Sequence, residues 1–351
     1  MSILNFFYYL TGWIIFLNLR FIKEEKPSNH HTISVIIPAR NEEHNIGKLL
    51  RSLMSQSYPI HEIIVVDDNS SDNTSQVVKS FQNVKLISLR KEPDNGWLGK
   101  PWACWNGYLH SKSEILIFID ADVELDSKAI ESIVGTLEKN EGLISIWPYQ
   151  RLEKPYEHLN FVFNMATVGS MVLIKFLKNK PIGAYGPLIA TFRKDYEKVG
   201  GHFSVKDKVI EDVELGKLYM KHKLKVHNYL GNGIVKFRMY PKGLTQLYEG
   251  ITKNIGRGVI SAGFINFLVL FLWFTGIYSS IFSLIFDKQV FMYILYIIQL
   301  SIFNKKLGDY NILDNILYPF HFLFFLFIFF VSCIKTFFLR KVKWKGREIK
   351  V

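Results

Sequence analysis

Short apolar segments that alternate with helical segments constrain the fold of this chain more than any other feature. Residues Ile115–Ile119 are five consecutive apolar residues, a pattern typical of a strand buried on both faces of a parallel sheet. Similar strands are predicted at 33–37, 63–66, 84–89, 143–147 and 188–192, and helices at 41–55, 74–82, 102–111 and 211–222. This order predicts an α/β domain with a doubly wound sheet.

Two acids follow the Ile115–Ile119 strand directly, in the sequence Asp120-Ala121-Asp122. In open α/β sheets, ligands bind at the carboxyl ends of the strands. Two carboxylates separated by one small residue can hold a hard divalent cation that also binds phosphate oxygens. The alternative interpretation is that both acids only begin a turn, and the neighbouring motifs have to decide between the two.

Three further polar clusters follow predicted strands of the same sheet. They are Pro38-Ala39-Arg40-Asn41-Glu42 after the first strand, Asp67-Asp68-Asn69-Ser70 after the second, and Gly96-Trp97-Leu98-Gly99-Lys100 after the third. Each cluster alone is also ordinary turn or loop chemistry. Together with Asp120 and Asp122 they make four clusters at the carboxyl ends of strands, which favours a binding site.

The residue types in these clusters suit a nucleotide diphosphate. Asp67 or Asp68 can accept hydrogen bonds from a nucleobase or a ribose hydroxyl. Gly96 and Gly99 allow close approach of the backbone, and Lys100 can neutralise a diphosphate. A metal ion on Asp122 would act as a Lewis acid that stabilises charge on a departing diphosphate.

Composition points to a membrane surface rather than to nucleic acid. The net charge is +12, aromatic residues make up 15% of the chain, and the mean hydropathy is +0.12. Basic residues crowd beside long apolar runs, as in 340–347, which is typical of contact with anionic lipid. Only two cysteines occur, Cys104 and Cys333, so a disulfide framework is not expected and a reduced compartment fits.

Apolar runs divide the chain into four segments. We predict an N-terminal membrane anchor at 1–22 (or an interfacial helix), a catalytic domain at 32–258, a membrane-embedded region at 259–339 and a basic cytoplasmic tail at 340–351. Within 259–339, residues 260–286 and 316–339 are each long enough to span, whereas 290–303 is short. With two spans and an interfacial middle segment, the positive-inside rule predicts a multi-pass cell-membrane protein whose catalytic domain is cytoplasmic.

Four motifs of this chain resemble the signatures of family 2 glycosyltransferases. They are Ile33–Asn41, Val65–Asp72, Asp120-Ala121-Asp122 and Glu211-Asp212. The resemblance implies a GT-A fold with a mixed sheet, a nucleotide-sugar donor that is usually a uridine diphosphate sugar, Mg²⁺ or Mn²⁺, and inversion at the anomeric carbon.

The resemblance also implies a role for individual residues. Asp122 is the main metal ligand, and Asp120 contacts the ribose or a metal-bound water. The catalytic pair is Asp212, as the base, with Glu211. The residues expected to bind substrate are Pro38, Ala39, Arg40, Glu42, Asp67, Asp68, Lys100, Asp120 and Lys253.

The residues themselves support Asp212 independently of the family. An inverting transfer to a hydroxyl needs a carboxylate that takes the acceptor's proton. Glu211 and Asp212 begin a helix downstream of a Gly200-Gly201-His202 loop whose glycines allow mobility. The alternative is that both acids simply favour a helix N-terminus. We expect Asp212→Asn to abolish turnover and preserve nucleotide-sugar binding.

A narrower resemblance is to the subgroup that glucosylates carotenoid acids. It rests on segments 99–104, 148–149, 163–169, 185–187, 237–240, 249–253 and 342–347. It implies transfer of glucose from UDP-glucose to the carboxylate of a C30 carotenoid acid. Because a carboxylate needs little deprotonation, Asp212 would then orient the acceptor or stabilise the site. Processive members carry Gln-x-x-Arg-Trp, which this sequence lacks, so a single transfer is expected.

Other functions remain open on the sequence alone. The same chemistry can act on another membrane lipid, such as a hopanoid, a diacylglycerol or a polyprenyl phosphate. A non-catalytic nucleotide-sugar-binding membrane protein is a second class, which the intact acids Asp120, Asp122, Glu211 and Asp212 disfavour. A nucleotidyltransferase is a third class, but its nucleotide loop is typically Gly-rich, unlike Ala39-Arg40-Asn41.

Overall fold

The computed structural model describes residues 3–174, 177, 182–261, 263–339, 341–344 and 347–350. The chain divides into two compact units, each of them discontinuous in sequence. A sheet unit comprises 20–149 and 183–237, and a helical unit comprises 1–19, 150–182 and 238–351. The four functional segments expected from the sequence remain predictions, and residues 340, 345, 346 and 351 of the expected tail lie outside the described residues.

The strands and helices of the sheet unit alternate along the chain as predicted. Its strands are β1 (Ile33–Ala39), β2 (Glu62–Asp68), β3 (Val84–Leu89), β4 (Ile115–Ile119), β5 (Val123–Leu125), β6 (Leu143–Trp147), β8 (Leu188–Phe192), β9 (Val226–Leu230) and β10 (Val235–Phe237). Its helices are α2 (Ile46–Met54), α3 (Thr74–Lys79), α4 (Gly99–Leu109), α5 (Ala129–Asn140), α7 (Arg193–Lys198), the 3₁₀ helix η3 (Gly201–Val205) and α8 (Glu211–Lys221). Helix α2 begins five residues later than expected, because Asn41 adopts a left-handed conformation with φ of 56°.

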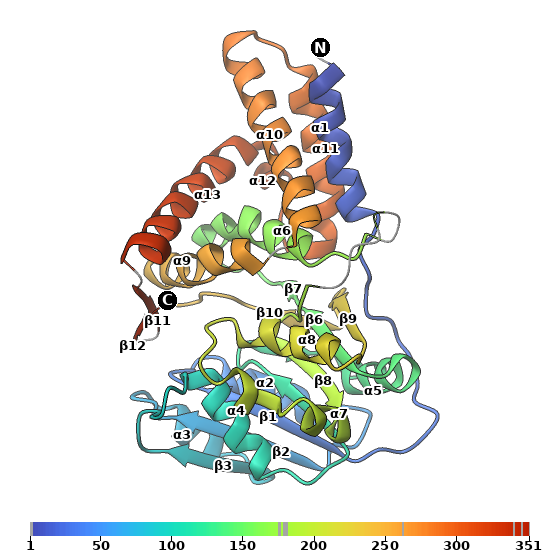
Figure 1. The fold of residues 1–351 in the computed structure, drawn as a ribbon, viewed down its shortest axis with the longest axis vertical. Coiled ribbons are helices and arrows are strands. Elements are labelled where there is room, and N and C mark those ends of the chain that lie inside the picture. The colour runs from blue at the N-terminus through green and yellow to red at the C-terminus, as the bar shows by residue number, and fades with distance from the viewer. Residues whose placement is uncertain are drawn as a thin grey trace. The chain divides into compact units, whose positions relative to one another are not determined.

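Seven strands form the main sheet in the order β3-β2-β1-β4-β8-β6-β9 (Figure 1). β1 is parallel to β2 and β4, and β2 is parallel to β3, whereas β8 is antiparallel to β4 and β6. The mixed sheet is therefore confirmed. β2 and β3 lie on one side of β1 and β4 lies on the other, so the carboxyl ends of β1 and β4 form a topological switch point, where ligands bind in such sheets.

The central strands are apolar because both faces of the sheet are covered. All five residues of β4 are buried. Ile36, Leu116 and Phe118 pack in one cluster with residues of α4, α7 and α8. Helix α4 lies close to the sheet because its inner face carries the small residues Ala103 and Cys104, which are at most 1% exposed.

The helical unit contains the apolar segments. Its main elements are α1 (Ile3–Phe16), η1 (Pro155–Asn160), α6 (Phe161–Ser170), α9 (Leu244–Ser261), α10 (Phe264–Phe286), α11 (Phe291–Leu307), α12 (Ile312–Ile316), α13 (Tyr318–Cys333) and the π-helical turn Ile334–Leu339, followed by strands β11 (Lys341–Trp344) and β12 (Arg347–Lys350). The short strand β7 (Tyr149–Gln150) falls at the boundary of the two units.

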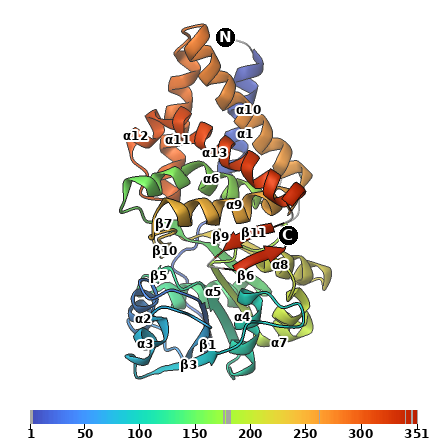
Figure 2. The same cartoon turned by 90° about the vertical axis from the view of Figure 1, so that its left-hand side faces the viewer.

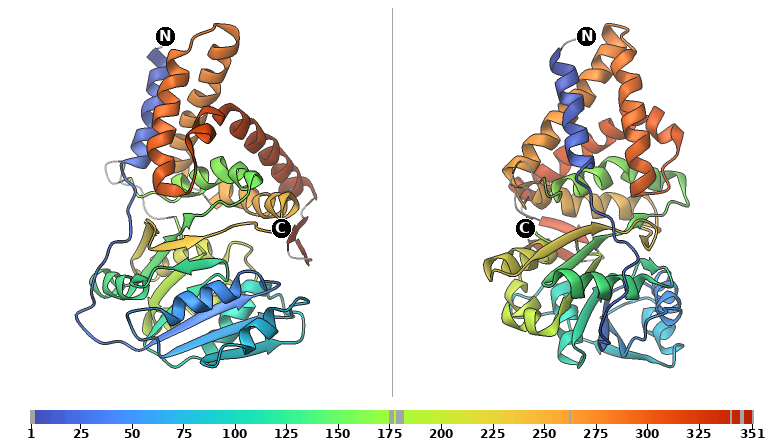
Figure 3. Two further views of the ribbon diagram at one scale, coloured as in Figure 1. Left: turned by 180° about the vertical axis from the view of Figure 1, so that it is seen from behind. Right: turned by 90° about the vertical axis from the view of Figure 1, so that its right-hand side faces the viewer.

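Two helices among the described residues are long and apolar enough to cross a membrane, namely Phe264–Phe286 and Tyr318–Thr336. Helices α1, α10 and α11 run alongside one another, whereas α6 and α9 lie across their ends (Figures 2 and 3). Buried polar side chains tie this bundle together, since Gln299 donates to the carbonyl of Tyr9 (3.0 Å) and accepts from the Trp273 indole (2.8 Å). The 17 residues of α11 rise about 26 Å, slightly less than the ~30 Å hydrocarbon core.

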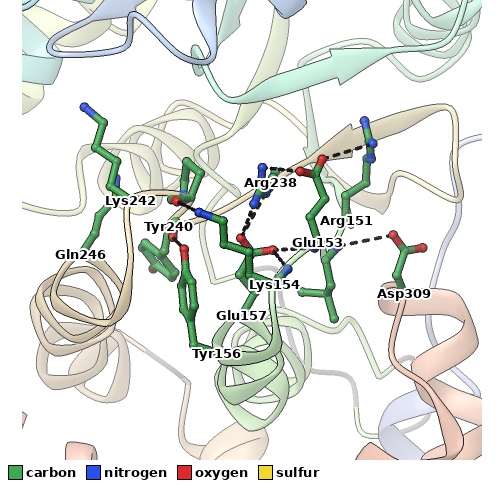
Figure 4. Close-up of polar contacts among 12 residues, drawn as sticks. Arg151, Glu153, Lys154, Tyr156, Glu157, Arg238, Tyr240, Lys242, Gln246 and Asp309 are labelled. Atoms are coloured by element: carbon green, nitrogen blue, oxygen red, sulfur yellow. Dashed lines mark hydrogen bonds and ion pairs between the residues drawn. The ribbon is translucent and has the colours of Figure 1, made fainter.

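A buried ion pair fixes the segment that leads into α9 (Figure 4). The Arg238 guanidinium contacts Glu157 Oε1 through Nη2 (2.6 Å) and Nε (3.1 Å), and it contacts Glu153 through Nη1 (2.5 Å). The Glu157 side chain is only 1% exposed. Tyr156 adds a hydrogen bond from its hydroxyl to the carbonyl of Tyr240 (2.9 Å). This clamp holds η1 to the chain that precedes α9.

Candidate active site

The predicted polar clusters gather at the carboxyl edge of the parallel strands. Ala39, the last residue of β1, pairs with Asp67 of β2. Asp120 follows β4 directly, and β4 is the other neighbour of β1. Because parallel strands end at the same edge, Ala39, Asp67 and Asp120 lie around the switch point. The sequence-based expectation of one shared edge is confirmed by this register.

Lys100 is the centre of the site. It lies in the first turn of α4, and its ammonium contacts Asp120 Oδ1 at 2.8 Å and Glu211 Oε1 at 3.3 Å. It also donates to the carbonyl of Gly186 at 3.3 Å. The Lys100 side chain is 32% exposed and that of Glu211 is 6% exposed. One cation thus joins residues from α4, the end of β4 and the start of α8.

Asp212 lies beside this contact on the first turn of α8. Its Oδ1 accepts a hydrogen bond from the backbone N–H of Val213 at 2.9 Å. Its Oδ2 faces Gly186 closely enough that a Cβ on that glycine would overlap it. The neighbouring Pro187 carbonyl accepts from the N–H of Asp120 at 2.9 Å. The loop before β8 therefore connects the β4 acids to the α8 acids.

The site has more acidic groups than its single lysine neutralises. Burial and the adjacent Glu211 raise the pKa of Asp212 to about 7, against the attraction of Lys100. Burial opposes the charge on Lys100, but Asp120, Glu211 and Asp212 outweigh it and hold the Lys100 pKa well above its ordinary value. Lys100 is therefore charged, and Asp212 exchanges its proton near neutral pH. Such displaced pKa values are typical of functional sites.

The first and second clusters form two loops that are joined by hydrogen bonds. The N–H of Asn41 donates to Ser70 Oγ at 2.9 Å, and Asn41 Oδ1 accepts from the N–H of Ser71 at 2.9 Å. Asn41 and Asn69 both adopt left-handed backbone conformations, which asparagine tolerates better than most residues. Neither was predicted as a structural residue of the site, although Asn within a turn motif is a recognisable signal.

Three acids and Arg40 have defined places in these loops. Asp67 is 5% exposed and accepts hydrogen bonds from the N–H of Ser70 (3.0 Å) and from the Ser75 hydroxyl. Asp68 is 4% exposed, and its carbonyl accepts from Arg40 at 2.8 Å. Glu42 accepts from the Asn45 side chain at 2.9 Å, so its carboxylate contributes to the local turn. Pro38 lies within β1, opposite Val66.

The remaining predicted residues have different surroundings. Asp122 is half-buried in the turn between β4 and β5. Lys253 is half-buried on α9 and belongs to the helical unit, whereas the other predicted site residues belong to the sheet unit. The roles assigned to Asp122 and Lys253 therefore remain predictions.

The sequence did not identify Gly186 as a residue of this site, nor did it predict that His202 lies buried near Lys100. His202 is 2% exposed, and its Nδ1 lies 2.8 Å from the Tyr196 hydroxyl, which also accepts from the His202 N–H at 2.9 Å. Burial and the nearby Lys100 lower the His202 pKa to about 3, so the ring is neutral. These contacts join His202, at the end of the Gly200–His202 loop, to Tyr196 of α7.

The mixed sheet has the GT-A-like fold of glycosyltransferases. A mannosyltransferase from Pyrobaculum calidifontis, solved with GDP-mannose and Mn²⁺, superposes with a TM-score of 0.57 over 96% of this chain and 95% of that protein. At 15% identity, this likeness concerns the fold. It confirms the GT-A-like sheet that the motifs predicted.

The chain belongs to glycosyltransferase family 2. The sequence profile described as glycosyl transferase family 2 matches residues 34–200. The 4,4′-diaponeurosporenoate glycosyltransferase of Staphylococcus aureus strain USA300 is 33% identical, and the alignment covers 92% of this chain and 89% of that protein. The protein of the same name from Staphylococcus haemolyticus strain JCSC1435 is 35% identical over 97% of this chain and 96% of that protein.

Proposed function

We propose that this glycosyltransferase is membrane-bound and transfers glucose from UDP-glucose to a carotenoid acid, with inversion at the anomeric carbon. The observation that carries the proposal is the Lys100 ammonium, which three carboxylates surround at the switch point. A lysine so placed can move from Asp120 to an incoming diphosphate. The staphylococcal relatives, similar over nearly their whole length, support the carboxylate of 4,4′-diaponeurosporenoate as the acceptor group.

The donor would be bound across the two joined loops. Asp67, Asp68 and Arg40 stand at the ends of β1 and β2, where the uridine and its ribose are expected. Pro38 and Ala39 line the same edge through the end of β1. Lys100 would neutralise charge on the diphosphate, and charge-assisted contacts of this kind are roughly twice as strong as neutral hydrogen bonds.

A divalent metal fits the acids that follow β4. Among the described residues, no group of three or more His, Cys, Asp or Glu side chains is arranged to enclose a metal by itself. Mg²⁺ sites in transferases need only one or two carboxylates, with the other ligands coming from phosphates and water. Asp122, with Asp120 beside it in sequence, is such a donor set. The bound Mg²⁺ or Mn²⁺ would supply Lewis-acid stabilisation of the departing diphosphate.

The transfer forms one bond and breaks one bond. An acceptor carboxylate oxygen attacks the anomeric carbon while the bond from that carbon to the diphosphate oxygen breaks, which yields a glucosyl ester and UDP. No proton has to be removed from an ionised carboxylate. Asp212 would therefore orient this acceptor, whereas a hydroxyl acceptor would need Asp212 as general base. Glu211 keeps Lys100 in place through their 3.3 Å contact.

Membrane attachment is supported by the helical unit. The two helices of spanning length carry large exposed apolar side chains, among them Phe264, Phe271, Phe282, Phe320, Phe327 and Phe330. An apolar surface of this size favours contact with lipid. We infer a multi-pass protein of the cell membrane, with its catalytic domain in the cytoplasm where UDP-glucose is made available. Lipid and carotenoid acceptors are concentrated in the same membrane.

Incubation of membranes that contain the protein with UDP-glucose and diaponeurosporenoic acid tests the proposal. We expect a glucosyl ester that is detected by mass and is absent with the Asp122→Asn variant. Transfer to a hopanoid, a diacylglycerol or a polyprenyl phosphate instead would show that the proposed acceptor is wrong and that the proposed enzyme class is right. If neither transfer nor metal-dependent hydrolysis of UDP-glucose occurs, the catalytic proposal is wrong.

A further inference from the structure

The loop before β8 is held firmly against the sheet and against α8. The N–H of Tyr185 donates to Ser145 Oγ at 2.6 Å, and the Asn228 side chain donates to the carbonyl of Gly183 at 3.1 Å. At the other end of the loop, the Pro187 carbonyl accepts from the N–H of Asp120 at 2.9 Å. Gly186 therefore has a defined position between two anchored neighbours.

Gly186 contacts two charged groups of the active site. Its carbonyl accepts a hydrogen bond from Lys100 at 3.3 Å. A Cβ at this position would overlap Asp212 Oδ2 and would lie 3.3 Å from Lys100 Nζ. The φ angle of Gly186 is not positive, so its backbone conformation would accept alanine. The nearest obstacles to a side chain here are the Asp212 carboxyl group and Lys100 Nζ.

We propose that Gly186 is a positioning residue for glycosyl transfer. Its lack of a side chain leaves space for the Asp212 carboxyl group, and its carbonyl binds the Lys100 ammonium, so that Gly186 determines the positions of both groups. The inference rests on the function proposed for this site. The other oxygen of Asp212 is also bound, since Oδ1 accepts from the N–H of Val213 at 2.9 Å. The anchored loop at Gly186 thus limits the position of the other carboxylate oxygen, Oδ2.

The structure indicates how a methyl group at this position would act. The overlapping atom of Asp212 is the end of a side chain rather than backbone, so the carboxyl group gives way and the fold is kept. A misplacement of about 1 Å in a group that orients a reactant costs on the order of 100-fold in rate. The loss should appear mainly in kcat, because the overlap falls on Asp212, whereas Lys100 Nζ would lie 3.3 Å from the new Cβ and keeps its hydrogen bond to the backbone carbonyl.

The test compares Gly186→Ala with Gly47→Ala, a control on α2 where the new Cβ would meet Val77 Cγ1 at an ordinary 3.4 Å. We expect kcat of Gly186→Ala to fall about 100-fold with KM for UDP-glucose within about threefold of the wild type. The control should retain the wild-type kcat. A Gly186→Ala kcat within about threefold of the wild type would overturn the inference. The assay uses whichever acceptor the wild-type protein glycosylates.

A second variant tests the contact without any substrate. Asp212→Ser shortens the side chain that the new methyl group displaces. Gly186→Ala should lower the melting temperature, and combining it with Asp212→Ser should return that temperature to the value of Asp212→Ser alone. An unchanged melting temperature in Gly186→Ala, or purely additive destabilisation in the double variant, would mean that Gly186 and Asp212 do not act on each other. This outcome is independent of the acceptor, so it separates failure of the inference from failure of the proposed function.

Discussion

Replacing Asp212 with asparagine is expected to stabilise the sheet unit at pH 8, although it removes a functional group. Burial and Glu211 raise the pKa of Asp212 from 3.8 to about 7. Between these two pH values, the folded state holds a proton that the unfolded state has released. Stability therefore falls as the pH rises from about 4 to about 7 and stays low above it.

The magnitude follows from the size of this pKa difference. About three pH units at about 1.4 kcal/mol each give a ceiling of about 4 kcal/mol. Asparagine removes the buried charge but also removes its attraction to Lys100, so we expect a gain on the order of 2 kcal/mol. For a unit of this size, that gain corresponds to about 4–8 °C in melting temperature.

The measurement is a thermal melt of wild type and Asp212→Asn from pH 4 to pH 8, with chelator present and without nucleotide. The two proteins should melt alike at pH 4 and diverge until about pH 7. Asp207→Asn serves as the control in the segment that precedes α8, because Asp207 is 57% exposed and Lys208 lowers its pKa. An Asp212→Asn variant that melts at or below the wild-type temperature at pH 8 would refute the reasoning.

Three other variants test separate parts of the structure. Lys100→Met removes the ammonium that is proposed to bind the diphosphate. Because a charged hydrogen bond contributes roughly 1.5–3 kcal/mol, the Kd for UDP-glucose measured by titration calorimetry should rise about 10- to 100-fold. An unchanged Kd would contradict this role. Asp122→Asn should weaken Mn²⁺ binding in the presence of UDP by at least about tenfold, and equal binding would place the metal elsewhere. Arg238→Met leaves Glu157 buried without its partner and should lower the free energy of unfolding by about 3 kcal/mol. The control Lys305→Met, an exposed position on α11, should have little effect.

The sequence alone predicted six of the seven strands of the main sheet and the edge at which the polar clusters meet, but it missed β9 and helix α5. This succeeded because local signals carry the information: β4 is an unbroken apolar run, and Asp120 and Asp122 follow it directly. The length of α10 likewise predicted a helix that can cross a membrane. The starts of α3 and α8 were predicted correctly, whereas α2 begins five residues later than expected, since Asn41 enters a left-handed conformation that Ser70 and Ser71 stabilise.

Only the tertiary structure decided which groups of the site act on one another. Lys100, Gly186 and Glu211 are far apart in sequence, and their contacts arise because antiparallel β8 returns the chain beside β4. The same packing buries Asp212 beside another acid and moves its pKa, which depends on the local dielectric and on neighbouring charges rather than on residue type. A sequence motif identifies the acids, but the packing of the folded chain determines their protonation and charge.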